Sequence, residues 1–210
     1  MATEKFMKLD PQKRKTILDA ALQEFADYGY EYASTNRIVE KAKISKGSLF
    51  YYFKSKKELY YYLINYGIEY VEKHYLPKVD EKETDLIEKF RKTAKIKLRS
   101  YSEIPGIFNF LGEVYINEFE SLPEDLKQRL LEMRNLAYTK LFKNIDTGLF
   151  REDMEPNEVI RLFSLTLSGY EKELVNRFKG KQISALNYEA YWQEYDEFLD
   201  LLKKAYYKSK

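Results

Sequence analysis

The segment SKGSLFYYF, residues 45–53, mixes groups that donate hydrogen bonds or carry positive charge with groups that belong in a protein core. On a helix, Leu49 and Phe53 lie four residues apart and share one face, which can pack against a preceding helix. The opposite side carries hydroxyl and ammonium groups, from Ser45, Lys46, Ser48, Tyr51 and Tyr52. Gly47 has no side chain, so another molecule can approach the backbone closely there. Together with the N–H groups of a helix N-terminus, this side suits the phosphates of a polyanion.

Positive charge is concentrated in the first quarter of the chain. Residues 1–57 hold 12 Lys and Arg against 7 Asp and Glu, a net charge of +5. Residues 58–210 hold 24 against 27, a net charge of −3. A basic module on a mildly acidic body favours a polyanion partner at one end of the molecule. Two simpler interpretations stay open: chance scatter of surface charge, and an ordinary loop and helix cap at residues 45–53.

The composition argues against several other classes of protein. The 210 residues are 44% hydrophobic and 33% charged, which is typical of a soluble globular chain. Cysteine is absent and His74 is the single histidine, so we expect no disulfide, metal site or Ser-His-Asp triad. No apolar run approaches the roughly 18 residues of a membrane span, and the N-terminus lacks the apolar region of a secretory signal. We therefore expect a cytoplasmic protein with no cofactor and no membrane partner.

Carboxylate pairs are the only sign of possible catalysis. Glu113 with Glu118, or Glu171 with Glu173, have the residue types of a general acid and base. However, 34 acidic residues spread over helices produce such pairs by chance, and no nucleophile or metal-ligand set accompanies them. We therefore name no catalytic residue and expect that the chain is not an enzyme.

The elements that position residues 45–53 are predicted to be helices. Asp10 followed by Pro11 is a helix start, and Gly29 is expected to end that helix in a left-handed conformation. Ser34 and Ser45 are placed to cap two short helices, with a tight turn between them. Two short helices joined in this way and braced by a preceding helix form a helix-turn-helix, whose last helix suits a DNA major groove.

The rest of the chain is also predicted to be helical. Ser55 and Glu58 have the spacing of a capping box and open a long helix that ends near His74. Further helices are expected at residues 81–102, 106–119, 124–147, 157–178 and 185–207. No stretch shows sustained period-2 alternation, so the chain is predicted to be all-α, with about nine helices and no strand. We expect the terminal arm MATEKFMK to be disordered, with a minor-groove contact through Lys5 or Lys8 as the alternative.

The segment from Pro11 to about Leu63 resembles the N-terminal domain of the tetracycline-repressor (TetR) family of bacterial transcriptional regulators. The matching stretches are ILDAALQEFADYGYEYAST and IVEKAKISKGSLFYYFKSKKELYYYL. The resemblance covers about a quarter of the chain. Two departures are visible: Phe50 stands where the family often has Tyr, and Tyr52 stands where His is common.

This resemblance implies an all-α homodimer that binds a palindromic operator in double-stranded DNA through successive major grooves. Residues 1–54 would be the helix-turn-helix DNA-binding domain, and residues 55–210 a larger helical domain for effector binding and dimerisation. The family's DNA contacts, mostly to phosphates, fall on Thr35, Ser45, Lys46, Gly47, Ser48, Tyr51, Tyr52 and Lys56. Because most members repress, we expect a repressor that a small apolar or aromatic effector releases.

Two helices of the body are candidates for the dimer interface. Residues 159–174 are apolar around most of the helix, and Ser168 and Gly169 are small enough for a second helix to approach closely. An aromatic stripe follows in the last helix. We predict a four-helix interface across a two-fold axis, formed by Leu162, Phe163, Thr166, Gly169, Tyr170, Tyr191, Tyr195, Phe198 and Leu202. The alternative is that this stripe packs entirely inside one monomer.

The effector site is predicted from a helix that is apolar on two faces, residues 104–119. Such a helix can line a cavity between neighbours, and small-molecule sites are mostly apolar with a few polar groups. The predicted lining is Tyr66, Tyr70, Phe108, Leu111, Tyr115, Tyr138 and Phe142, with Asn109, Glu113 and Asn135 as polar anchors. The same stripe also fits a plain core. The alternative function is therefore a helix-turn-helix regulator whose body binds a protein partner or only dimerises.

Overall fold

The computed structural model describes residues 4–103 and 105–208, and this part of the chain holds ten α-helices and no β-strand. The helices are α1 (Glu4–Met7), α2 (Pro11–Tyr32), α3 (Thr35–Lys41), α4 (Lys46–Phe53), α5 (Lys56–Tyr70), α6 (Leu86–Glu103), α7 (Pro105–Glu113), α8 (Glu124–Leu141), α9 (Pro156–Phe178) and α10 (Tyr188–Tyr206). Turns of π-helix, Val71–Tyr75 and Val114–Glu118, extend α5 and α7. The predicted all-α fold is confirmed.

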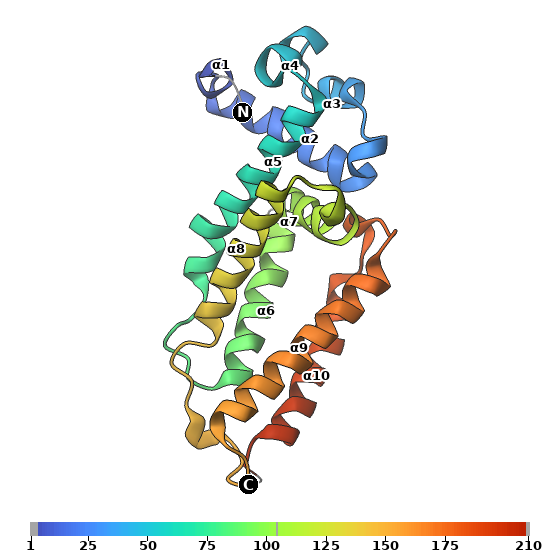
Figure 1. The fold of residues 1–210 in the computed structure, drawn as a ribbon. Helices are drawn as coiled ribbons and strands as arrows, with labels where there is room; N and C mark the ends of the chain where they lie inside the picture. The colour runs from blue at the N-terminus through green and yellow to red at the C-terminus, as the bar shows by residue number, and fades with distance from the viewer. Residues whose placement is uncertain (1–3, 104, 209–210) are drawn as a thin grey trace.

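The molecule is elongated, with a helical head at one end and a longer helical body below it (Figure 1). We use "head" for α1–α4 and "body" for α5–α10. Helix α5 descends from the head, and α9 and α10 form a pair whose connection returns toward the head. The N-terminal end of the chain lies at the head and the C-terminal end at the far end of the body. Among the described residues, no helix has the length and apolar character needed to cross a membrane.

Buried apolar side chains form two separate cores. The head-side core joins α1–α5 to α7 and the start of α8, through residues such as Phe25, Leu63 and Phe110. The far core joins the start of α6 and the end of α8 to α9 and α10, through residues such as Phe90 and Phe163. Burying such side chains is the main favourable contribution to folding. Because the head-side core includes both the head and part of the body, the head is packed against the body and is not a separate domain on a linker.

Local capping sets the starts of the helices that matter for the head. Asp10 accepts hydrogen bonds from the backbone N–H groups of Gln12 and Lys13, at 2.9 and 3.1 Å. The hydroxyl of Ser45 accepts from the N–H of Ser48 at 3.0 Å, which starts α4. These two caps are confirmed. Ser34 precedes α3 as predicted, but its side chain makes no capping hydrogen bond.

Three boundaries differ from the sequence prediction. The arm is not disordered over its described part, since Glu4–Met7 form a helical turn and Phe6 is fully buried. Helix α6 begins at Leu86 instead of residue 81, because the carboxylate of Asp85 caps it by accepting from the N–H of Glu88 at 3.0 Å. Helix α8 ends at Leu141 instead of residue 147.

Candidate nucleic-acid interface

Helix α4 divides into an inner and an outer side, as its sequence predicts. Leu49 and Phe53 are buried, and the ring of Phe53 packs against Phe6 and Tyr62 with centroids 4.6 and 5.4 Å apart. Lys54 ends the helix in a left-handed conformation, with φ of 59°. The outer side therefore faces solvent at the free end of the head (Figure 1).

The predicted DNA-contacting residues have different degrees of exposure. Ser45, Lys46 and Gly47 are exposed at the N-terminus of α4, and Tyr51 is 53% exposed one turn later. Half-buried positions are occupied by Thr35, Ser48, Tyr52 and Lys56. The structure thus brings a cation, an open backbone position and a phenol to one surface, which is a suitable set of groups for phosphate contacts.

Lys56 has a role inside the chain that the sequence did not predict. Its ammonium group donates to the backbone carbonyl of Glu31 at 3.0 Å and lies 4.9 Å from the ring centroid of Tyr30. A positively charged group near the C-terminal end of a helix is favourable because unpaired carbonyls gather there. Lys56 therefore attaches the start of α5 to the end of α2, and its phosphate contact stays a prediction.

An ion pair between the buried Glu24 and the exposed Arg37 fixes α3 against α2. The side chain of Glu24 is fully buried, and its Oε1 accepts from Nε of Arg37 and from the N–H of Ser34, both at 2.8 Å. Arg37 also donates to the carbonyl of Tyr32 at 3.0 Å and lies over the ring of Tyr28. Glu24 raises the pKa of Arg37 through this hydrogen bond. The signal in the sequence was a carboxylate on the buried face of an amphipathic helix, which requires a partner.

Gly29 lies where the head meets the body. Its φ is 64°, so the helical conformation breaks there as predicted, although Tyr30–Tyr32 form a further turn. A Cβ atom at this position would lie 2.9 Å from Oε1 of Glu118. That same oxygen accepts from the N–H of Tyr30 at 3.1 Å. Glu113 lies beside it, and burial together with the charge of Glu118 raises the pKa of Glu113. The Glu113/Glu118 pair is thus a structural junction.

The connection between α9 and α10 also contacts the head. Asp27 of α2 accepts from the hydroxyl of Ser184 at 2.6 Å and from Nε2 of Gln182 at 3.3 Å. Nearby, Asn117 accepts from the N–H of Gly180 at 2.7 Å. The end of the α9–α10 pair is therefore hydrogen-bonded to the head, a contact that sequence reasoning did not find. We call the Asp27–Ser184–Gln182 contact the latch.

Comparison with known proteins identifies the head. Residues 17–63 match the family model described as "Bacterial regulatory proteins, tetR family". Residues 17–63 thus form a DNA-binding domain of the TetR family. The A-factor receptor protein of Streptomyces griseus is 44% identical over 48 residues, which are 23% of this chain and 17% of that relative. This match thus spans about a sixth of the relative's length.

Two further proteins resemble this chain over most of its length. The fatty acid metabolism regulator protein of Bacillus subtilis is 26% identical over 156 residues, which are 73% of this chain and 74% of that one. A TetR family transcriptional regulator from Chloroflexus aurantiacus J-10-FL superposes with a TM-score of 0.61 over 100% of both chains, at 23% identity. The second likeness establishes a shared TetR-family fold for head and body together.

The residues predicted to line an effector site do not form one group. Phe108 and Leu111 are buried in the head-side core, and Tyr66 and Tyr70 pack against that core from α5. Phe142 packs against the far core, stacked on Tyr138 at a centroid distance of 6.1 Å. The predicted anchors Asn109 and Glu113 accept hydrogen bonds inside the chain, from Tyr188 and Asn117.

Tyr115 and Tyr138 do come together, around an ion pair between α8 and α9. Arg134 donates to the hydroxyl of Tyr115 at 2.9 Å and to Glu171 at 3.2 Å. Tyr138 donates to the other oxygen of Glu171 at 2.6 Å. Burial and this carboxylate raise the pKa of Tyr138. We call these four side chains the Arg134 cluster.

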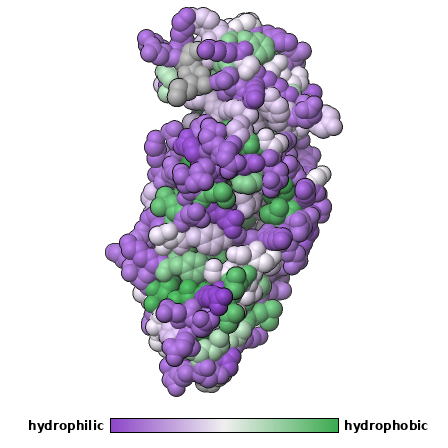
Figure 2. Space-filling model, viewed as in Figure 1, coloured by the Kyte–Doolittle hydropathy of each residue, from purple (hydrophilic) through white to green (hydrophobic). Residues whose placement is uncertain are grey.

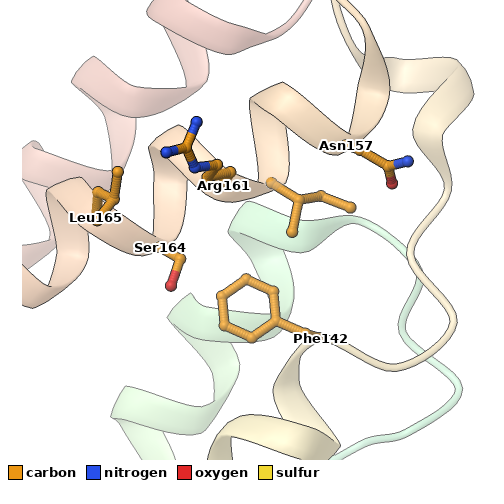
Figure 3. Close-up of a pocket in the computed structure, with 6 residues that line it drawn as sticks. Phe142, Asn157, Arg161, Ser164 and Leu165 are labelled. Atoms are coloured by element: carbon orange, nitrogen blue, oxygen red, sulfur yellow. The ribbon is translucent and has the colours of Figure 1, made fainter.

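An open groove of about 370 Å³ lies on the surface near the end of α8. It is lined by Phe142, Asn157, Ile160, Arg161, Ser164 and Leu165. Figure 3 shows the ring of Phe142 directed toward α9, with the hydroxyl of Ser164 beside it. Only Phe142 of the predicted effector residues lines this groove, and its lining combines an apolar floor with a guanidinium group.

The predicted dimer residues divide between the surface and the interior. Phe163 and Leu202 are buried in the far core of a single chain, which favours for these two residues the alternative of packing inside one monomer. A helix that is apolar all round does not reveal which side faces its own chain. Tyr170, stacked on Phe198 at 4.3 Å, and Tyr191, edge-on to Phe178, are half-buried within the chain.

Other positions on α9 and α10 remain open to a second copy. Leu162, Leu165 and Leu201 are among the large apolar side chains that are exposed, at 37%, 59% and 63%. Gly169 is exposed, and a Cβ added there would meet no atom of the described chain within 4 Å. Figure 2 shows apolar patches interrupting the hydrophilic surface of the body, most extensively in its lower half. Exposed apolar side chains of this kind are typical of an interaction surface.

Proposed function

We propose that the chain is a homodimeric, sequence-specific DNA-binding regulator that works in the cytoplasm and represses transcription from a palindromic operator. Residues 1–54 bind DNA, and residues 55–210 dimerise and bind a small effector that releases the operator. The observation that carries this proposal is α4: its apolar side is buried, and Lys46, Gly47 and Tyr51 are exposed at the free end of the head. The match of residues 17–63 to the TetR family model supports the same assignment.

In the DNA complex, α4 enters a major groove and contacts phosphates from both ends. The N-terminus of α4 supplies Lys46 and the free N–H groups, while Tyr51 supplies a hydroxyl donor. Two copies place their α4 helices about one DNA turn apart, roughly 34–36 Å. The ion pair of Arg37 with the buried Glu24 holds α3 and thereby the angle of α4. Affinity for DNA falls steeply with salt because phosphate contacts release counterions.

The effector acts by favouring a different spacing of the two heads. It can do so only through different affinities for the two arrangements. Contacts between body and head include α5, anchored by Lys56, the Glu118–Tyr30 hydrogen bond and the latch on Asp27. The latch supports a direct influence of α9 and α10, the proposed dimer helices, on the orientation of α2.

The Arg134 cluster is the best-supported place for the effector in the body. It joins α8 and α9 through polar and aromatic side chains, and it contains Tyr115 and Tyr138, two of the residues predicted to line the effector site. The fatty acid metabolism regulator is a relative that aligns over most of the chain. We therefore propose acyl compounds, free fatty acids among them, as the first effectors to test. A guanidinium group beside two phenols suits the carboxylate of a free fatty acid.

The experiment that tests the function is an operator selection. Purified protein is incubated with sheared genomic DNA at near-physiological salt, and bound fragments are sequenced. A shared palindrome upstream of a few genes supports the proposal, and the neighbouring genes narrow the effector class. Enrichment without a common motif contradicts it.

A second candidate function is a TetR-family regulator whose body binds a protein partner or only dimerises. The observation that favours it is the distribution of the predicted effector residues between two cores. A thermal-shift screen of acyl compounds separates the candidates, because a ligand that binds the folded state raises the midpoint with concentration. A midpoint that no acyl compound moves favours the second candidate.

A further inference from the structure

The N-terminal arm is anchored to the helix that is proposed to read DNA. The ring of Phe6 has no exposed surface and packs against Tyr52, Phe53 and Tyr62, with centroids 5.8, 4.6 and 5.8 Å apart. Tyr52 and Phe53 belong to α4, and Tyr62 belongs to α5. Burial of an aromatic side chain in such a cluster stabilises the position of the segment that carries it.

The backbone after Phe6 is held as well. Arg14 of α2 donates to the carbonyl of Met7 at 2.6 Å, and the hydroxyl of Tyr62 contacts the sulfur of Met7 at 3.9 Å. The arm thus contacts α2, α4 and α5 within three residues. This attachment removes most of the conformational freedom that a terminal segment would lose on binding a partner.

Anchoring Phe6 places the neighbouring Lys5 beside the outer side of α4. The ammonium group of Lys5 lies 4.1 Å from the ring centroid of Tyr51, which is the most exposed aromatic residue of α4. Within residues 4–103 and 105–208, no ion pair is formed by Lys5. Figure 1 shows α1 beside α4 at the free end of the head. A cation that pairs with no carboxylate of the described residues therefore lies at the proposed DNA surface.

We propose that Lys5 is a further DNA-contacting residue and that Phe6 is the positioning residue that presents it. The ammonium group of Lys5 contacts a backbone phosphate next to the one addressed by Tyr51, and its cation–π contact fixes the ring of Tyr51 for that approach. This inference rests on the proposed DNA-binding function. It replaces the expectation of a disordered arm with a pre-ordered part of the interface.

The test measures operator affinity as a function of salt, using the duplex enriched by the genomic selection and a scrambled duplex of equal composition. Lys5→Ala removes one phosphate contact per subunit, so two per dimer. The slope of log affinity against log salt should become shallower by about 1.8, and affinity at 0.1 M salt should fall roughly tenfold or more. Lys5→Arg should retain both. The matched control is Lys204→Ala, the same charge change at the C-terminal end of α10.

Phe6→Ala tests the positioning of Lys5 separately from its charge. The variant keeps Lys5 but releases the arm from α4 and α5. Affinity for the operator should therefore fall, while the salt slope changes less than in Lys5→Ala. Phe6→Leu should recover most of the affinity. Thermal unfolding of each variant shows whether the head stays folded. If Phe6→Ala lowers only the melting temperature and leaves affinity unchanged, the arm is merely structural and the proposal is overturned.

The outcomes also distinguish this inference from the function on which it rests. Wild-type protein that prefers no duplex contradicts the proposed function itself. If the wild type binds the operator but Lys5→Ala equals Lys204→Ala in affinity and salt slope, only the proposed role of Lys5 is overturned.

Discussion

The hydroxyl of Ser184, between α9 and α10, donates a hydrogen bond of 2.6 Å to Oδ1 of Asp27 in the head. The two residues are 157 positions apart in the chain. This contact joins the head-side end of α9 and α10, the proposed dimer helices, to α2 of the head (Figure 1). It adds to the attachment of the head through α5 and through the Glu118–Tyr30 hydrogen bond.

Replacing Asp27, the acceptor of the latch, should increase the mobility of residues 179–187, the segment that connects α9 to α10. In Asp27→Ala, the donors Ser184 and Gln182 lose their partner, whereas Asp27→Asn retains an oxygen acceptor. We expect the alanine variant to lose about 1 kcal/mol of unfolding free energy and the asparagine variant less. Hydrogen exchange followed by mass spectrometry should show faster exchange over residues 179–187 in Asp27→Ala. Equal exchange in both variants would mean that the latch does not hold this segment.

Gly29 should tolerate no side chain. Alanine at this position combines a φ of 64° with a Cβ atom 2.9 Å from Oε1 of Glu118. We expect Gly29→Ala to lower the free energy of unfolding by about 2 kcal/mol, measured by urea denaturation. Gly106→Ala is the control, since its added Cβ would meet Leu22 at an ordinary contact distance of 3.6 Å. A Gly29→Ala variant as stable as Gly106→Ala would contradict this geometry.

The local parts of the head were predictable because they depend on neighbouring residues. Asp10 and Ser45 act as caps through atoms two or three positions away, so their sequence spacing was sufficient. Asp85 and Glu88 carry the same spacing, which indicates the start of α6 at Leu86. The end of α8 depends on a positive φ at Asn144 and on the buried ammonium of Lys89, which donates to the carbonyl of Lys143. The second contact spans 54 positions and has no local signature.

Tertiary packing decided the positions that sequence periodicity misassigned. Phe6 lies in a short arm without a long apolar run, and only the aromatic cluster on α4 and α5 reveals its burial. Phe163 and Leu202 lie on helices that carry apolar residues on more than one face, so spacing alone did not separate interior from surface. For Tyr115 and Tyr138, the decisive group was Arg134, which no apolar stripe indicates.

The dimer prediction can be tested at Gly169. Its open surroundings within one chain allow a larger side chain, so Gly169→Leu should leave the monomer folded. If a helix of the second copy packs closely there, leucine should weaken the dimer about tenfold, because overpacking costs 1–3 kcal/mol. Sedimentation measurements over a range of protein concentrations provide the dissociation constant. Gly169→Ala should have a smaller effect, and unchanged dissociation in both variants would place the interface elsewhere.

Glu113 should make stability depend on pH. Burial and the charge of Glu118 raise the pKa of Glu113 in the folded protein, so the folded state binds its proton more tightly than the unfolded state. Stability should therefore fall as pH rises from the ordinary glutamate pKa through the raised one. Glu113→Gln has no proton to lose and should gain stability relative to wild type over that window, with the difference vanishing at lower pH. Urea denaturation between about pH 4 and pH 8 checks the direction of this change in stability. A difference that does not vary with pH would exclude Glu113 as the titrating group.

The most direct test of DNA recognition is the operator affinity of Lys46→Ala, measured by fluorescence anisotropy at several salt concentrations. Lys46 is exposed at the first position of α4, so the substitution should leave the fold intact. We expect affinity for the selected operator to fall roughly tenfold or more and the salt slope to become shallower by about 1–2, while Lys204→Ala matches wild type. Wild-type affinity and an unchanged slope in Lys46→Ala would contradict the placement of α4 on DNA.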